Sequence, residues 1–363
     1  MTQAKKYKRC MVMAGGGFRF GIYLGMYAAA CEAGRPPDLL LASCGSAIAA
    51  SIIASLPDDR QRKAWLNSRE MYDFWGKLKS SSQATITRTL AQAAKRKFSK
   101  KNVATIPDLF NDYLFEVPEK LPSPPNLTGE PQVAVAIIGG KLLFSEEEVG
   151  QLRGQRKLFA ETVFCDQHAA DLLNGMASPL SDPRWGNHAI SDQLLTDVQT
   201  PHTVAARISI ADMFYFRCYT HAGENYIGGV LDLFPIELAR RLADEVMIEF
   251  KQGFDQTFSI PAWRSVLGVD GNARLKYVNG QAVDYRIDTS DITFALAKQS
   301  AQKKLDWRKN RINLVMPETY DAYVQVMSAQ WQYGYERGME AFQRQQPYEE
   351  KLIRSVDRYS RGC

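Results

Sequence analysis

Residues 11–54 read MVMAGGGFRFGIYLGMYAAACEAGRPPDLLLASCGSAIAASIIA, and this stretch decides the fold. A short apolar run at 11–14 precedes three glycines, and a second run at 39–41 precedes a turn of small residues. Helical patterns follow at 22–31 and 47–54, so the order is strand, glycine loop, helix, strand, tight turn, helix. Short apolar strands joined through a helix are typical of a parallel sheet that is covered on both faces.

The two turns have the features that acyl transfer requires. Glycines let backbone N–H groups converge on an anion, and a nucleophile on a strand-to-helix turn projects from the sheet beside a helix N-terminus. A glycine loop alone is also compatible with a nucleotide phosphate. This loop, however, lacks the full G-x-G-x-x-G spacing, and no acidic residue ends the next strand. The pairing of loop and turn therefore favours acyl transfer.

The loop resembles the GGGxRG loop of the patatin-like phospholipase family, although Phe20 stands in place of its last glycine. The resemblance implies that the loop forms an oxyanion hole, with backbone N–H groups directed at a site near the nucleophile. The residues to which it gives this role are Gly15, Gly16, Gly17, Phe18 and Arg19.

The second turn resembles the family's GxSxG nucleophile elbow, in two alternative registers. Anchoring on Asp38, which fits the Asp that opens the family's strand, places residues 42–46 on the motif and Cys44 at the nucleophile position. A shift by one residue retains Ser43 as the nucleophile and loses the Asp38 anchor. Both registers remain open on the sequence.

Residues 226–235 resemble the family segment in which the catalytic Asp precedes two glycines. Gly228, Gly229 and Asp232 fit it, but Ile227 occupies the position of the Asp. The family uses a Ser–Asp dyad, and isoleucine cannot accept a proton. We expect Ile227 to lie beside Cys44 and the two glycines to form a turn with positive φ.

Two consequences follow from this substitution. Restoring the family pair by Cys44→Ser with Ile227→Asp is expected to raise esterase activity. If Ser43 is the nucleophile, the base must have moved. The candidates for such a base are His221, Glu224 and Asp232.

The 363 residues, 45% of them hydrophobic, suit one large α/β domain with additions, or two domains. Six cysteines show no CxxC spacing and no Cys/His cluster, so free thiols and no metal or cofactor are expected. No signal peptide is indicated at the N-terminus. The longest uncharged run, at 39–56, is interpreted as a buried strand and helix and not as a membrane span.

The stretch from Lys77 to Lys101 carries eight cations and no acid. It predicts either a solvated helix face or contact with an anionic membrane surface or an acidic acyl carrier protein. The net charge of +5 permits such partners, and no specific nucleic-acid site is expected. The sequence does not indicate the oligomeric state.

Downstream, the patterns predict further elements and two hairpin turns. They are a strand at 203–207, a helix at 238–250, turns at 270–272 and 279–280, a basic helix at 293–307, and helices at 322–345 and 348–359.

The resemblance implies a patatin-like three-layer α/β core with a mostly parallel sheet. Residues 1–250 form the predicted acyl hydrolase domain and residues 251–363 a helical extension packed on it. The implied function is that of a lipid acyl hydrolase or acyltransferase acting through Cys44 on an acyl lipid or acyl thioester. The alternatives are a catalytically degenerate protein that binds an acyl lipid or an acyl carrier, and a serine hydrolase using Ser43. The expected location is the cytoplasm, with the inner face of a membrane as a peripheral site.

Overall fold

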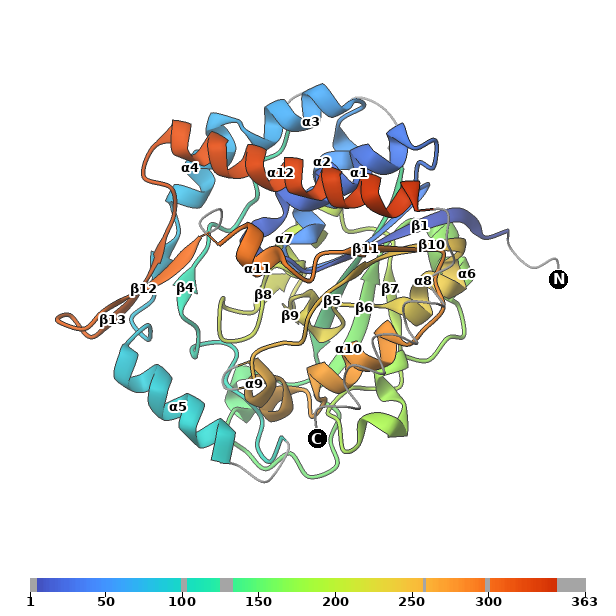
Figure 1. Ribbon diagram of the computed structural model, residues 1–363. Helices are drawn as coiled ribbons and strands as arrows, with labels where there is room; N and C mark the ends of the chain where they lie inside the picture. Colours follow the sequence, from blue (N-terminus) through green and yellow to red (C-terminus); the bar gives the residue numbers. More distant parts are fainter. Residues whose placement is uncertain (1–4, 99–102, 125–132, 257–258, 298–300, 345–363) are drawn as a thin grey trace, which may run out of the picture.

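The computed structural model describes the whole chain except residues 1–4, 99–102, 125–132, 257–258, 298–300 and 345–363 (Figure 1). A nine-stranded mixed sheet lies at its centre, in the order β11-β10-β1-β2-β5-β6-β7, with β9 paired to β5 and to β8. The strands are β1 (Tyr7–Ala14), β2 (Leu39–Ser43), β5 (Ala134–Leu142), β6 (Phe159–Phe164), β7 (Leu195–Asp197), β8 (Tyr219–His221), β9 (Glu224–Ile227), β10 (Ala243–Phe250) and β11 (Tyr285–Asp288).

The two apolar runs predicted as central strands are neighbours in this sheet. β1 pairs with β2 in parallel, with Met11 opposite Leu40 and Ala14 opposite Ser43. The pairs β11–β10, β10–β1, β2–β5 and β6–β7 are also parallel, whereas β5 runs antiparallel to β6 and β9. The prediction of a mostly parallel sheet built around these two strands is confirmed.

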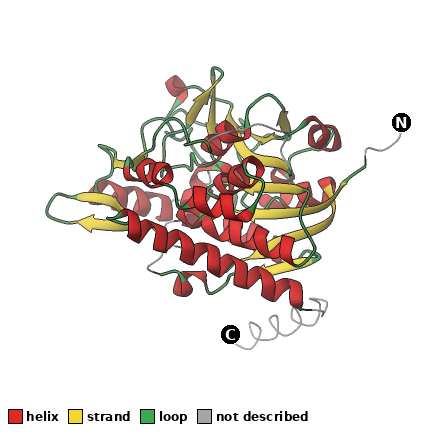
Figure 2. Cartoon of the chain, turned by 90° about the horizontal axis from the view of Figure 1, so that it is seen from above, coloured by secondary structure: helices red, strands yellow, loops and turns green. Residues whose placement is uncertain are grey.

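Helices cover both faces of the sheet (Figures 1 and 2). Met11 and Met13 of β1 face a core built with α1, α2, α4, α7 and α12, and Cys10 and Val12 face a core built with α6, α8 and α10. The helices are α1 (Gly21–Glu32), α2 (Ser46–Ser55), α3 (Asp59–Leu66), α4 (Arg69–Gly76), α5 (Ile86–Phe98), α6 (Gln167–Leu173), α7 (His202–Ser209), α8 (Ile236–Leu242), α9 (Ser259–Val266), α10 (Gly271–Asn279), α11 (Ile292–Ala295) and α12 (Tyr320–Gln343).

Two short antiparallel ribbons lie outside the main sheet. One pairs β3 (Lys79–Ser80) with β4 (Phe115–Glu116), and the other pairs β12 (Gln302–Asp306) with β13 (Arg311–Val315). Both are on the side of the molecule that carries α5 (Figure 1). The β12–β13 ribbon and α5 border a cavity of about 550 Å³.

The long helix α12 lies directly against α1 (Figure 1). Gly25 and Gly334 make this close approach possible. A Cβ atom at Gly25 would overlap the carbonyl oxygen of Trp331, and one at Gly334 would overlap the carbonyl oxygen of Ile22. The helix predicted at 322–345 is confirmed as α12. The segment after residue 250 also supplies β11 to the sheet, and the proposed domain division stays a prediction.

Several predicted elements are wrong. The expected strand at 203–207 is part of α7, and the expected helix at 238–250 is α8 followed by β10, which pairs with both β1 and β11. The expected turns at 270–280 are instead α10, which Asp270 caps by accepting from the N–H groups of Asn272 and Ala273. The expected basic helix at 293–307 is also wrong, because this range holds the end of the short helix α11 and the strand β12. The helix predicted at 348–359 lies outside the described residues.

Candidate active site

The strand-to-helix turn between β2 and α2 holds Cys44 in a strained conformation. Cys44 has φ 54°, a value that residues other than glycine rarely adopt and that often marks functional sites. Its side chain is only 3% exposed. The backbone N–H of Cys44 donates to the hydroxyl of Ser209 (2.8 Å), which donates in turn to the carbonyl of Ile138 (2.7 Å). The turn is therefore fixed from the neighbouring helix and strand.

The glycine loop presses against this turn. Gly15, Gly16 and Gly17 all have positive φ, at 73°, 95° and 54°, which explains why three glycines stand in a row. A Cβ atom on Gly45 would overlap the carbonyl oxygen of Gly17, so glycine is also needed directly after Cys44. The loop and the turn together line a cavity of about 260 Å³ that also reaches Asp212.

Phe20, which replaces the last glycine of the family loop, is fully buried and packs against Trp75 with ring centroids 5.6 Å apart. The loop is held instead by a side chain from α12. Gln330 donates from Nε2 to the carbonyl of Phe18 (3.1 Å), and its Oε1 accepts from the N–H of Gly21 (3.2 Å). The departure at Phe20 is thus accommodated by a residue some 300 positions later.

A carboxylate lies beside the thiol. Cys44 Sγ donates to Asp212 Oδ1 at 2.8 Å, and Asp212 sits just beyond the C-terminus of α7. The sequence reasoning missed Asp212, because it searched for a base only close to Ile227, between His221 and Asp232. The available signal was an acidic residue directly after the uncharged run 208–211. This position is next to the second motif in space.

Burial is the largest cause of the pKa shifts of Cys44 and Asp212. It raises the pKa of the Cys44 thiol well above its ordinary value, and the charge and hydrogen bond of Asp212 raise it further, while Lys251 opposes them. Burial also raises the pKa of Asp212 to about 7, against the opposing hydrogen bonds from Cys44 and from the N–H of Val230. The resting pair is therefore a neutral thiol that donates to a carboxyl group poised to titrate near neutrality.

The two glycines of the second motif are needed for close packing. A Cβ atom on Gly229 would lie 2.5 Å from the backbone N of Cys44, and one on Gly228 would lie 2.6 Å from Asp212 Oδ1. The expected positive φ is wrong, because Gly228 has φ −70° and is extended. Ile227 lies at the end of β9, and its side chain packs against Gly140 of β5.

Ser43 is the last residue of β2, and its hydroxyl is committed elsewhere. It is fully buried and donates to the backbone carbonyl of Asp232 at 2.7 Å. The three side chains considered as bases for Ser43 also have other partners. Asp232 pairs with Arg274, Glu224 pairs with Lys141, and His221 lies 3.2 Å from the hydroxyl of Thr200.

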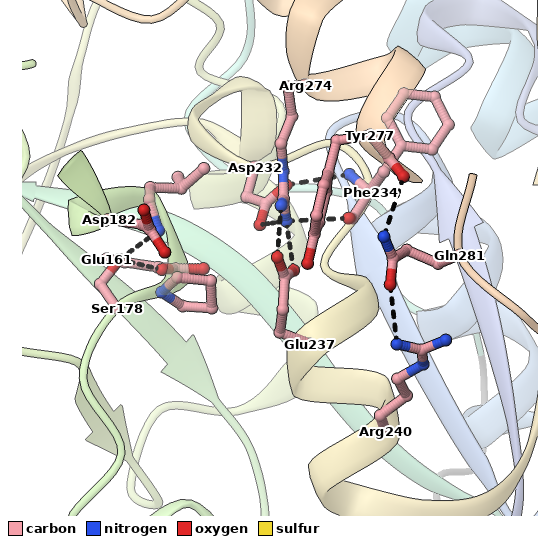
Figure 3. A network of polar contacts seen from close by, with 12 residues as sticks. Glu161, Ser178, Asp182, Asp232, Phe234, Glu237, Arg240, Arg274, Tyr277 and Gln281 are labelled. Carbon is pink, nitrogen blue, oxygen red and sulfur yellow. Dashed lines mark hydrogen bonds and ion pairs between the residues drawn. The ribbon is translucent and has the colours of Figure 1, made fainter. Parts of the chain in front are cut away.

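Asp232 belongs to a network of polar contacts (Figure 3). Arg274 of α10 lies 2.9 Å from Asp232 and also pairs with Glu237 of α8. Both acids therefore share one nearly buried guanidinium, which keeps the buried Asp232 paired. Glu161 lies nearby on β6, and its fully buried carboxyl group accepts from Ser178; burial and the charge of Asp232 raise its pKa to about 8. The Asp232 carbonyl that binds Ser43 is thus fixed by a polar network.

A second polar cluster lies under the glycine loop. Lys251, which follows β10, donates to the carbonyl of Ala14 and pairs with the buried Glu249 at 3.1 Å. Tyr23 of α1 donates to the same Glu249, and Thr289 also donates to it. The cluster places a cation close enough to oppose the rise in the pKa of Cys44.

A larger cavity of about 550 Å³ adjoins the first, and Asp212 and Tyr215 line both. Its walls are mainly apolar and come from α5, α9 and the β12–β13 hairpin. They include Ile86, Leu90, Met213, Trp263, Leu305 and Trp307. Cys44 is not among the lining residues of either cavity, and its hydrogen-bond partner Asp212 lines both.

Other kinds of site find no support in the described part of the chain. No group of three or more His, Cys, Asp or Glu side chains is arranged to hold a metal ion there. Among the same residues, no helix has the length and apolar character needed to span a membrane.

Comparison with known proteins identifies the class. A family model described as patatin-like phospholipase matches residues 11–240, more than half of the chain. The chain therefore belongs to the patatin-like phospholipase family, and the predicted fold class is confirmed. Among solved structures, VipD from Legionella pneumophila is similar at 12% identity and a TM-score of 0.35, over 94% of this chain and 67% of VipD. No curated protein matches the chain.

Proposed function

We propose that the protein is a patatin-like lipid acyl hydrolase or acyltransferase in which Cys44 is the nucleophile and Asp212 is its base. The observation that carries the proposal is the 2.8 Å contact between the Cys44 thiol and the Asp212 carboxyl group on a strained elbow. Asp212 does what the family's Asp does, from a different position in the sequence. The proposed site therefore has a base, Asp212, although Ile227 replaces the Asp of the family motif.

The chemistry needs these two side chains, the acyl substrate, and water or an acceptor alcohol. As the sulfur attacks the acyl carbonyl carbon, the thiol proton passes to the Asp212 carboxylate, and the carbonyl oxygen becomes an oxyanion. Collapse of this intermediate breaks the bond to the leaving alcohol or thiol, which takes the proton from Asp212. Water or an acceptor alcohol then attacks the Cys44 thioester, gives its proton to Asp212, and the departing sulfur recovers that proton.

The glycine loop is the proposed source of oxyanion donors. The N–H of Cys44 is already bonded to Ser209, so it is not available for this role. Gly16, Gly17 and Phe18 line the same cavity as Asp212, and their backbone dipoles are worth most in a site shielded from water. Lys251 adds a positive charge beneath the loop.

The larger cavity is the proposed acyl site. It begins at Asp212 and is lined mainly by apolar side chains, so it suits the hydrocarbon tail of an acyl lipid or acyl thioester. The head group or carrier would then remain toward the opening. Leu305 and Trp307 line the cavity and are exposed, which supports an opening on the side of the β12–β13 hairpin.

Replacing Cys44 tests the proposal. Cys44→Ala is expected to reduce turnover of a soluble short-chain ester to background. Cys44→Ser alone should be at least as active as the wild type, because Asp212 already stands where a Ser–Asp dyad needs it and burial denies the thiol its usual ease of ionisation. The added Ile227→Asp change expected from the sequence is then unnecessary.

The matched control is Cys165→Ala, which removes another buried thiol, on the C-terminal side of β6. It should leave turnover unchanged. Wild-type turnover in Cys44→Ala would contradict the assignment of the nucleophile. A third outcome would instead support a degenerate binding protein. In that case the wild type binds the acyl ligand without turning it over, and Cys44→Ala and a folded Cys44→Ser are both inactive.

A further inference from the structure

The side of the molecule formed by α5 and the β12–β13 hairpin combines exposed apolar side chains with unpaired cations. Of the nine large hydrophobic side chains that are exposed in the described part, five lie on these elements. Phe98 is 79% exposed and Trp307 is 68% exposed. The other three are Leu90, Leu305 and Val315. Such a concentration on one side of a protein marks an interaction surface.

α5 and the hairpin are fixed to each other. Asn310, in the hairpin turn, donates from Nδ2 to the hydroxyl of Thr87 (2.8 Å) and accepts at Oδ1 from the N–H of Thr87 (3.1 Å). The N–H of Ile86 also donates to the carbonyl of Asn310 (3.3 Å). Ile86 and Ile312 share a small apolar cluster below this contact. The two elements therefore present one connected surface, at the left of Figure 1.

The cations on this surface are of two kinds. Arg88 and Arg96 pair with Asp112, at 3.3 and 3.0 Å, and Arg96 also lies over the ring of Phe214. On the hairpin, Lys303 lies over the ring of Tyr215, and Arg311 donates to the carbonyl of Ser80. The remaining cations are exposed, and within the described residues no ion pair engages them. They are Lys95 and Lys97 on α5, and Lys304, Arg308 and Lys309 on the hairpin. The basic stretch predicted from the sequence is thus extended by a second basic element.

The surface also surrounds the mouth of the larger cavity. Leu90, Leu305 and Trp307 line the cavity and are exposed at the same time. Lys304, Arg308 and Lys309 are exposed and do not line the cavity, so they can contact a surface outside the protein. A ligand that enters the cavity on this side therefore passes exposed apolar side chains, and the cations lie outside the cavity lining.

We propose that this face docks onto an anionic lipid surface, with Trp307 and its apolar neighbours entering the interface and the free cations meeting the lipid head groups. The proposal deepens the proposed function, because it assigns the surface at which an acyl lipid enters the cavity. Tryptophan is favoured at the boundary between lipid and water, and each Lys or Arg near an anionic bilayer contributes attraction. An acidic protein would satisfy the cations but would not account for the protruding apolar side chains at the cavity mouth.

The test measures partition of the full chain onto vesicles of phosphatidylcholine with and without phosphatidylglycerol. The variant Lys304→Glu/Arg308→Glu/Lys309→Glu should lower partition onto the anionic vesicles by about a hundredfold, given the contribution per cation at such a surface. The loss should shrink as salt rises, because exposed charges are screened beyond about 8 Å at physiological ionic strength. Trp307→Ala should lower partition severalfold without changing its dependence on salt.

The matched control reverses three exposed cations elsewhere, as Lys5→Glu/Arg60→Glu/Lys276→Glu, and gives the same net charge. It should retain most of the wild-type partition. Cys44→Ala should bind vesicles like the wild type, so the failure of the nucleophile and the failure of the docking surface are distinguishable. Equal losses in the two triple variants, or partition that ignores phosphatidylglycerol, would overturn the proposal. The proposal would also be overturned if the triple hairpin variant lost binding to an acidic acyl carrier protein but still bound the vesicles like the wild type.

Discussion

Asp212→Asn is expected to lower kcat/KM for a soluble short-chain ester by about two to four orders of magnitude, the usual contribution of a positioned general base. The amide keeps the size of the side chain and its fit against Gly228, but it cannot accept the thiol proton. Thermal unfolding should therefore change little while turnover falls. Asp171→Asn, an exposed carboxylate on α6, is the control and should behave as the wild type.

The pH profile gives the same variant a second readout. Only the ionised carboxylate accepts a proton, and burial raises the pKa of Asp212 to about 7. The wild-type rate should therefore rise with pH through about 7, since the protonated form predominates below that pH and is inactive as a base. Asp212→Asn should lose this limb. A variant with the wild-type rate and profile would show that the base is another group.

Gly334→Ala is expected to destabilise the protein by about 1–3 kcal/mol or more, the usual cost of overpacking a close contact. The new methyl group would overlap the carbonyl oxygen of Ile22, and helix backbones cannot yield as a flexible side chain can. The melting temperature should fall by about 2 °C or more for a chain of this size. Ester turnover should fall as well, since α12 carries the Gln330 side chain that holds the glycine loop.

The matched control is Gly76→Ala, at the C-terminal end of α4. A Cβ atom there meets nothing within 4 Å, so the substitution should be neutral or slightly stabilising. Calorimetry of both variants separates the effect of α1–α12 packing from the general effect of replacing a helical glycine. Equal melting temperatures for Gly334→Ala and the wild type would contradict the close contact between the two helices.

The parts of the fold that the sequence predicts correctly are local ones. The apolar runs, the three glycines and the small residues after β2 specify their strands and turns within about forty residues, so β1, α1, β2 and α2 follow from the pattern. The elbow at Cys44 and Gly45 can be predicted for the same reason, because it directly follows the strand β2. Glycine is required at position 45 by the close contact with Gly17, which is also near in sequence.

The elements and site residues that the sequence did not predict depend on contacts between distant parts of the chain. β10 has an apolar pattern that is also compatible with a helix, and only its pairing with β1 and β11 makes it a strand. Asp212 reaches Cys44 because α7 packs beside α2, across 168 residues of chain. The motif itself pointed to Ile227. Gln330 supports the loop from still farther away, and no local pattern marks it.

The most direct test of the central claim is to identify the residue that carries the acyl group. The protein, in a Cys31→Ser/Cys363→Ser background that removes an exposed thiol and the C-terminal one, is mixed with octanoyl coenzyme A and quenched in acid after different times. Intact mass and peptide mapping should show a single octanoyl group on Cys44, none in Cys44→Ala, and slower labelling in Asp212→Asn. Coenzyme A release from a protein that is never acylated, or an octanoyl group on Ser43 or another residue, would contradict the account.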